Sequence, residues 1–345
     1  MAYTTINKST DYFNTKLYTG TGSSNAQTGV GFQPDWTWIK ERASAGHDHN
    51  LFDAVRGVTK SIKSNTSGAQ TTDAQDLKTF DSDGFTLGTN GGINENNVTF
   101  ASWNWKANGA GSSNTDGSIT STVSASTTSG FSIVKWTANA GTATIGHGLN
   151  AVPKMIIVKS LANATTWMVQ HSSLGSGKEI YLNNTSAANN STAWNSTDPT
   201  STVFTVTGGG GDGVNASGDY VAYCFADIKG FSKFGSYVGN GNADGAFIYT
   251  GFKPAFVIIK RYDSGTLDWN MYDSKRLGYN GGDAPLFADL NNSESNDYGR
   301  IDFVSNGFKI RTSNDQLANN GGKFLYMCFA EAPLVGSNNI PSTAR

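Results

Sequence analysis

Three short segments of the chain are almost entirely apolar, and they predict buried β-strands. Each begins at a proline shortly after a Gly-Phe or Gly-Leu pair and ends on a lysine six residues later. The segments are PDWTWIK at 34–40, PKMIIVK at 153–159 and PAFVIIK at 254–260. A sheet tolerates proline at the start of a strand, and a continuous apolar run predicts a strand covered on both faces. We therefore interpret Trp36 and Trp38 as buried strand residues rather than as an exposed ligand platform.

Two further blocks follow each proline at nearly constant distances. The second block reads HNLFD at 49–53, WMVQH at 167–171 and WNMYD at 269–273, and it ends 19, 18 and 19 residues after the proline. The third block reads ASWNWKA at 101–107, YVAYCFA at 220–226 and FLYMCFA at 324–330. Within this third strand, large apolar residues two apart share one face, and Asn104, Cys224 and Cys328 fall on the other. Ordered landmarks at constant spacing indicate an internal repeat.

Each copy has the size and punctuation of a β-sandwich. Lead-in strands are expected at 13–18, 131–136 and 231–237, and the turns before Phe85 and Phe308 predict tight hairpins. About 100 residues with several short strands is the size of a sandwich domain. We predict an all-β fold of three tandem, homologous β-sandwich-like (jelly-roll-like) units. The alternative is one continuous assembly in which the units lend strands to one another.

The repeat spacing sets the predicted domain boundaries. Repeat 1 with an N-terminal arm covers residues 1–108, repeat 2 covers 130–229, and repeat 3 with a C-terminal tail covers 230–345. Residues 109–129 are rich in Ser, Thr, Gly and Asn. That composition is typical of flexible polar segments, so we expect a linker there.

Charge and composition exclude several classes of partner. The chain has 345 residues with 25 basic and 27 acidic side chains, a net charge of −2. No basic excess is present to neutralise phosphates, so we expect no nucleic-acid partner. No apolar run approaches the ~18 residues of a membrane span, so we expect no membrane insertion. The N-terminus has no charged region followed by an apolar one, so no Sec-type signal peptide is expected.

Candidate chemistry is sparse, and each motif has a structural interpretation. His47 and His49 could share a strand face and hold zinc, but no further ligand accompanies them, and His49 falls where the other copies have tryptophan. Asp81 and Asp83 resemble part of a calcium loop, but the remaining ligands are missing, so we interpret them as turn residues. The glycines at 208–211 lack the context of a phosphate-binding loop. We expect no catalytic, cofactor-binding or metal-binding residues and no cofactor.

Two residue types remain to be placed. Cys224 and Cys328 occupy the same position in two copies, so we expect buried free thiols rather than a mutual disulfide, as in a reducing cytoplasm. Trp194 lies in a Ser/Asn/Thr-rich loop and is the candidate for an exposed, ligand-binding aromatic. The loops at 182–200 and 207–217 are the candidate glycan contacts.

Several stretches resemble a known family. Residues 3–40, YTTINKSTDYFNTKLYTGTGSSNAQTGVGFQPDWTWIK, resemble the start of virion structural proteins of marine (cyanophage-type) tailed phages. FDSDGFTLG at 80–88, ASWNWK at 101–106 and the ending APLVGSNNIPSTAR at 332–345 are also similar. The resemblance covers nearly the whole chain, and the middle unit fits least well. It implies tail-fibre-like or appendage proteins, brings no catalytic residues, and suggests a homotrimer by family analogy.

The expected function follows from this resemblance and from the missing chemistry. We expect a non-enzymatic virion protein, a tail fibre, an appendage or a capsid decoration, that is folded in the host cytoplasm and acts in assembly or host-surface adhesion. Its partners would be other virion proteins, with a host surface glycan as a further candidate. One alternative is a lectin-like glycan-binding module. A second is an envelope-polysaccharide hydrolase, which the absence of a repeated acidic pair disfavours.

Overall fold

A computed structural model describes residues 3–43, 46–209, 213–276, 280, 284–295, 299–333 and 335. Within these ranges the chain is built from antiparallel strands, and its helices are the short η1 (Ser9–Asp11) and α1 (Gly91–Asn94). The prediction of an all-β fold is confirmed. No helix of the described residues is long and apolar enough to cross a membrane.

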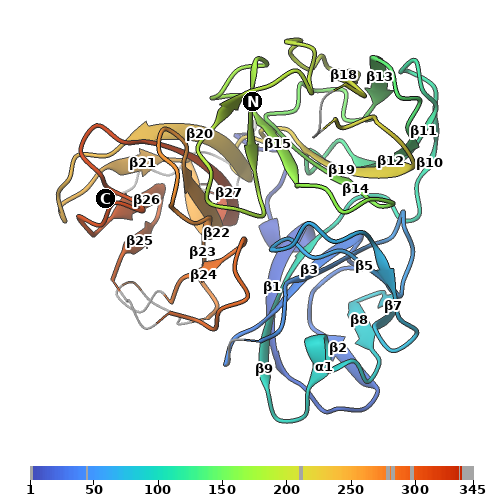
Figure 1. The fold of residues 1–345 in the computed structure, drawn as a ribbon. Coiled ribbons are helices and arrows are strands. Elements are labelled where there is room, and N and C mark those ends of the chain that lie inside the picture. Colours follow the sequence, from blue (N-terminus) through green and yellow to red (C-terminus); the bar gives the residue numbers. More distant parts are fainter. Residues whose placement is uncertain are drawn as a thin grey trace.

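One strand order occurs three times along the chain. The first sheet has the order β1 (Phe13–Thr19), β9 (Thr99–Trp105), β3 (Trp36–Glu41), β4 (Asn50–Asp53). The same order appears as β12 (Phe131–Thr137), β19 (Asp219–Phe225), β14 (Met155–Ser160), β15 (Met168–His171), and as β20 (Ser232–Val238), β27 (Lys323–Pro333), β22 (Phe252–Arg261), β23 (Asn270–Asp273). In each set the order is the lead-in strand, the strand of the third block (the closing strand), the strand that contains or closely follows the proline (the proline strand) and the strand of the second block. We call the three sets, with the strands packed on them, units 1, 2 and 3; Figure 1 shows them as blue-to-cyan, green-to-yellow and orange-to-red lobes.

A smaller sheet packs against each main sheet. These sheets are β2 (Asn25–Thr28), β8 (Gly84–Leu87), β7 (Leu77–Asp81) in unit 1; β13 (Ala143–Gly146), β18 (Val203–Val206) in unit 2; and β21 (Phe247–Tyr249), β26 (Gly307–Ile310), β25 (Ile301–Val304) in unit 3. Short additional strands are β5 (Lys60–Ser61), β6 (Thr71–Thr72), β16 (Lys178–Tyr181), β17 (Asn189–Asn190) and β24 (Leu286–Phe287). The sandwich character is therefore present in all three lobes, whereas common descent of the units stays a prediction.

The predicted linker is part of a sheet. Within 109–129, β10 (Ser112–Asn114) pairs with β11 (Ser121–Ser126), and β11 pairs with β12 at the edge of the unit 2 sheet. Val123 is buried in the core of unit 2, and Ile119 packs against it. The expectation of a flexible connection was wrong because a few apolar residues, spaced among serines and threonines, are enough to hold an edge strand.

The three main sheets share one apolar core. One face of each sheet packs on its own smaller sheet, and the opposite face meets the other two units. Residues of the shared core include Trp36, Trp38, Trp103 and Trp105 from unit 1; Ile133, Met155, Tyr223 and Phe225 from unit 2; and Phe256, Ile258, Met327 and Phe329 from unit 3. This arrangement explains the apolar runs, because each proline strand is covered on both faces, as predicted.

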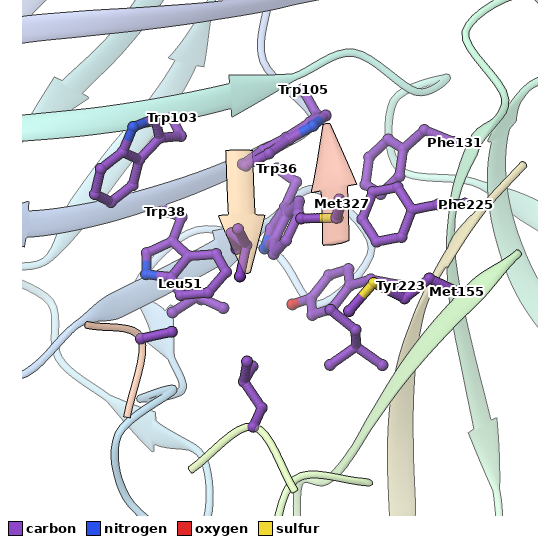
Figure 2. Packing of buried hydrophobic residues seen from close by; sticks show 14 of the residues in the cluster. Trp36, Trp38, Leu51, Trp103, Trp105, Phe131, Met155, Tyr223, Phe225 and Met327 are labelled. Atoms are coloured by element: carbon purple, nitrogen blue, oxygen red, sulfur yellow. The ribbon is translucent and has the colours of Figure 1, made fainter. Parts of the chain in front are cut away.

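Trp36 lies at the centre of this core. Its ring centroid is 4.3 Å from that of Trp105 and 4.3 Å from that of Tyr223, and Figure 2 shows the indole between these two side chains. Trp36 and Trp38 are fully buried. The interpretation of residues 34–40 as a buried strand entry is confirmed.

Candidate functional site

Equivalent side chains connect the units in a cycle. The first residue of the second block contacts a backbone carbonyl of a neighbouring unit in all three cases. His49 Nε2 lies 2.9 Å from the carbonyl of Phe287 in unit 3, Trp167 Nε1 donates to Lys63 in unit 1 (2.9 Å), and Trp269 Nε1 donates to Tyr181 in unit 2 (2.8 Å). Because each unit contacts a different neighbour, the three contacts close a ring around the shared core.

A second ring of hydrogen bonds forms at the last residue of the same block. There the closing strand of a neighbouring unit provides the partner. Tyr223 Oη of unit 2 donates to Asp53 (2.7 Å), Trp103 Nε1 of unit 1 donates to Asp273 (3.0 Å), and His171 Nε2 lies 3.3 Å from the carbonyl of Tyr326 in unit 3. These hydrogen bonds satisfy polar atoms that the shared core would otherwise leave unpaired. The equivalence of Asp53 and Asp273 therefore reflects a structural role between the units.

The Asp53 site is a closed ion pair. Arg56 Nε lies 2.5 Å from Asp53 Oδ2, and both side chains are fully buried. The backbone N–H groups of Val55 and Arg56 donate to Asp53 Oδ1, and Tyr223 donates to Oδ2. Burial alone would lower the pKa of Arg56, but the carboxylate beside it raises this pKa. With its acceptor sites occupied, Asp53 is placed to hold the interface rather than to transfer protons.

The two histidines that contact a neighbouring unit, His49 and His171, are engaged at both ring nitrogens. His49 Nδ1 accepts from Trp38 Nε1 (2.8 Å), so its Nε2 carries the proton that goes to Phe287. His171 Nδ1 accepts from the N–H of Ser173 (3.1 Å), so its Nε2 donates to Tyr326 in the same way. Burial lowers the pKa of His49 to about 3 and that of His171 to about 4. Both rings are neutral donors and are not free to act as general bases.

His47 does not join His49 in a metal site. The His49 ring points into the shared core, whereas His47 Nε2 lies 2.9 Å from a carboxylate oxygen of Glu95 at the surface. Among the residues that the structure describes, no group of three or more His, Cys, Asp or Glu side chains could hold a metal ion.

Three buried lysines occupy equivalent positions in the three units, and the sequence analysis assigned them no function. Lys40, Lys159 and Lys260 end the apolar runs of the three proline strands, and none is exposed. Each Nζ donates to backbone carbonyls, of Glu41, of Ser160 and Asn163, and of Leu267, respectively. Burial lowers the pKa of each to about 8. The recurrence of lysine six residues after each proline was the signal for this role.

Trp194 is not an exposed aromatic. Its exposed fraction is 0%, and it packs into the core of unit 2, where its loop folds back over the sandwich. The N–H of Thr207 donates to the carbonyl of Ala193 (2.9 Å) and fixes this loop against the start of the next one. The prediction of Trp194 as a surface ligand contact was wrong, because the polar residues around it gave no sign of this closure. Residues 210–212 of the loop at 207–217 lie outside the described residues, as do 336–345 at the end of the segment that carries the resemblance.

The remaining motifs have the roles that the sequence suggested. Asp83 accepts from the N–H groups of Gly29 (2.9 Å) and Gly31 (2.6 Å), and these bonds lower its pKa. It is a turn anchor. Cys224 and Cys328 are free and buried in the separate cores of units 2 and 3, so the expectation of unpaired thiols is confirmed.

The most distinctive surface feature lies on unit 3. Phe247 and Tyr249 on the edge strand β21 are 48% and 52% exposed. Lys233 Nζ lies 5.4 Å from the Tyr249 ring centroid, and Lys229 Nζ lies 4.4 Å from that of Tyr3. We call these five residues the aromatic edge. Exposed rings flanked by cations are typical of contact surfaces, because rings bury much area and lysines add charge.

A polar cavity of about 570 Å³ lies on unit 1 and is lined in part by Asp48, Asp73 and Asp76. Burial, reinforced by nearby Asp73, raises the pKa of Asp76 to about 6. Asp48 accepts from Lys63 (2.8 Å), and Asp76 accepts from Asn90 (2.8 Å). Asp48 and Asp76 are thus partnered within the chain, and the described residues that line the cavity include no Phe, Tyr or Trp.

The fold and the hydrogen bonds between the units, which we call the junction, together define the class of protein. It is an all-β protein in which one chain closes three sandwich-like units around a common core. The chain belongs to the family described as Domain of unknown function (DUF7483), which matches residues 8–333. This match runs from before β1 to the end of β27, so the whole three-unit assembly corresponds to one family domain. No curated protein and no solved structure matches the chain.

Proposed function

We propose that the chain is a non-enzymatic structural component of a tailed-phage virion, a tail fibre, an appendage or a capsid decoration. One observation carries this proposal: three sheets of the same strand order surround a shared core, and side-chain hydrogen bonds link the units around it. Such a body is a rigid building block. The type of particle, a tailed-phage virion, is inferred from the resemblance of the sequence to virion proteins of tailed phages.

The cyclic arrangement favours one copy at a threefold position. A single chain already buries the surfaces that three separate subunits would bury in a trimer, so the shared core needs no further copy. The chain would then sit on a capsid threefold axis or on a trimeric fibre. The homotrimer expected by family analogy is the alternative. Sedimentation of the purified protein separates the two, because their masses differ threefold.

The aromatic edge is the proposed contact to other virion proteins or to the host surface. Phe247 and Tyr249 bring apolar area to the surface of an edge strand, and aromatic residues dominate the binding energy of many interfaces. The remaining exposed large apolar side chains in the described part of the chain are Val152 and Val238. Interfaces rarely form around single exposed valines, so the edge is the stronger candidate.

The test is the position of the chain in the particle. Gold labelling or a particle map of intact virions should place it at one defined site, and its absence from purified particles would overturn the proposal. A Phe247→Ala, Tyr249→Ala double variant should lose incorporation while its thermal unfolding stays unchanged. Val238→Ala is the matched control, because it removes an exposed apolar side chain of the same unit outside the edge.

A lectin-like module is the second candidate, favoured by exposed rings beside lysines. Sugars stack on exposed aromatic faces, and the aromatic edge offers two of them. A glycan array with the wild type and with Tyr249→Ala tests it: binding lost in the variant supports a lectin role. The hydrolase alternative gains no comparable support, since Asp53, Asp273, His49 and His171 are held in hydrogen bonds between the units. Release of reducing sugars from host envelopes would reinstate it.

A further inference from the structure

One position of the second block differs in kind between the units. Phe52 in unit 1 and Tyr272 in unit 3 pack their rings into the separate cores of those units. Unit 2 has Gln170 at this position, paired across the strands with Ile156. A glutamine side chain is smaller than an aromatic ring and cannot fill the same space with apolar contacts. The change therefore leaves room in unit 2 that the other two units fill.

A cavity of about 180 Å³ lies at this position. Its floor includes Ile156 and Gln170, which are buried and paired across the strands, and Pro153 adds an apolar wall. Asp198, with the neighbouring Pro199, closes one side from the loop after β17. The volume is below the ~300 Å³ at which pockets for drug-sized ligands begin. It accommodates one small group of a ligand while the rest stays outside.

Gln170, which lines this pocket, carries an unpaired hydrogen-bond acceptor. Its exposed fraction is 5%, and its Oε1 has no hydrogen-bond partner among the residues that the structure describes. A buried acceptor without a partner is costly, and a ligand N–H removes that cost. A primary amide carries an acceptor and a donor side by side, so its natural complement is a secondary amide.

We propose that this pocket binds the acetamido group of an N-acetylated sugar. The methyl group would contact the apolar walls, the amide would pair with Gln170, and the sugar ring would stay at the mouth. The mouth carries Lys154, Ser172 and Asp198, whose polar groups suit sugar hydroxyls. The proposal does not depend on a place in a virion, because it concerns binding by the isolated chain.

The pocket is a binding site and not a catalytic one. His171 also lines it, but its Nδ1 accepts from Ser173 and its Nε2 donates to Tyr326, so neither nitrogen faces a ligand free to exchange a proton. A bound sugar would leave unchanged.

Ile156 provides the readout, because it lines the pocket, packs in the core of unit 2 and lies opposite Gln170 on the paired strand. In protein labelled at the isoleucine δ1 methyl groups, Ile156 reports on the pocket, and Ile157 and Ile258, which lie in the shared core, serve as internal references. We expect methyl N-acetyl-β-glucosaminide to shift the Ile156 signal in a saturable way with a Kd of about 1 mM. Methyl β-glucoside, which lacks the acetamido group, should leave the signal in place.

Two variants complete the test. Gln170→Phe, which installs the residue of unit 1, should abolish the Ile156 shift while thermal unfolding is unchanged or improved. Gln170→Leu removes the amide at similar size and should weaken binding at least tenfold, so it keeps the test valid if the larger ring disturbs the fold. No saturable shift in the wild type, an equal shift with the glucoside, or undiminished binding by a folded Gln170→Leu protein would each overturn the proposal.

Discussion

The indole N–H of Trp38 donates to Nδ1 of His49 over 2.8 Å inside the shared core. His49 in turn donates from Nε2 to the carbonyl of Phe287 in unit 3. The same two positions hold Ile157 with Trp167 in unit 2, and Ile258 with Trp269 in unit 3. An indole at position 38 needs an acceptor that an isoleucine does not need, and histidine supplies it while keeping the contact to the neighbour. The identities of Trp38 and His49 are thus coupled, and we expect that the two residues can be replaced together but not singly.

A double-mutant cycle tests this pair. Trp38→Ile should lower the free energy of unfolding by about 2–4 kcal/mol, because it leaves a cavity and an unpaired Nδ1. His49→Trp should lower it by about 1–3 kcal/mol, because Trp38 loses its acceptor and the core is overpacked. The double variant copies units 2 and 3 and should be more stable than the sum of the two losses by about 0.5–3 kcal/mol. Urea unfolding measures all four proteins, and strictly additive losses would contradict the pairing.

The strands and their burial were predictable from the sequence because the repeat marked them three times. The apolar run at 155–158 indicated a strand covered on both faces, and one of these covers is the shared core. What covers a strand could not be inferred, since periodicity describes one element and not its neighbours. Trp194 and Val123 were misplaced for a related reason: both lie among polar residues, and local composition does not reveal that a loop folds back or that a serine-rich segment joins a sheet edge. Gln170 was visible only as a departure from its two counterparts.

Acid should destabilise the protein through its buried histidines. The pKa of His171 is lowered from 6.5 to about 4, so below pH 6.5 the unfolded chain takes up a proton that the folded chain refuses. Stability therefore falls as the pH drops from about 6.5 to about 4, by up to about 1.4 kcal/mol per pH unit for this group. His171→Asn removes the titration, and its Oδ1 can accept from Ser173 as Asp53 Oδ1 accepts from Val55.

The comparison is between wild type and His171→Asn, unfolded in urea at pH 5 and at pH 7. Burial also lowers the pKa values of His49 and His147, which contribute equally to both proteins and cancel from the difference. Asp76 and Asp289 act in the opposite direction, because their pKa values are raised to about 6, and they cancel too. The variant should lose less stability between pH 7 and pH 5 than the wild type. Identical losses would show that His171 is not held neutral by burial.

The ion pair between Asp53 and Arg56 should be costly to break from one side. Asp53→Ala leaves the guanidinium of Arg56 buried without its carboxylate and should lower the free energy of unfolding by about 3–5 kcal/mol. Tyr223→Phe removes a single hydrogen bond from the same carboxylate and should cost about 1 kcal/mol. Asp11→Ala, which breaks a surface pair with Lys8, is the control and should change little. Equal effects of Asp53→Ala and Asp11→Ala in urea unfolding would mean that Asp53 does not hold the junction.

Thiol labelling should show whether the shared core unfolds as one body. Cys224 and Cys328 lie in the separate cores of units 2 and 3, and burial raises the pKa of both thiols, so neither should react with a thiol reagent at pH 8 in the native protein. Because the main sheets of both units bury one face in the common core, opening of one unit exposes apolar surface of the other. Both cysteines should therefore become reactive at the same urea concentration, which peptide mass spectrometry can follow for each thiol. If Cys328 reacts well before Cys224, unit 3 opens alone and the core is not cooperative.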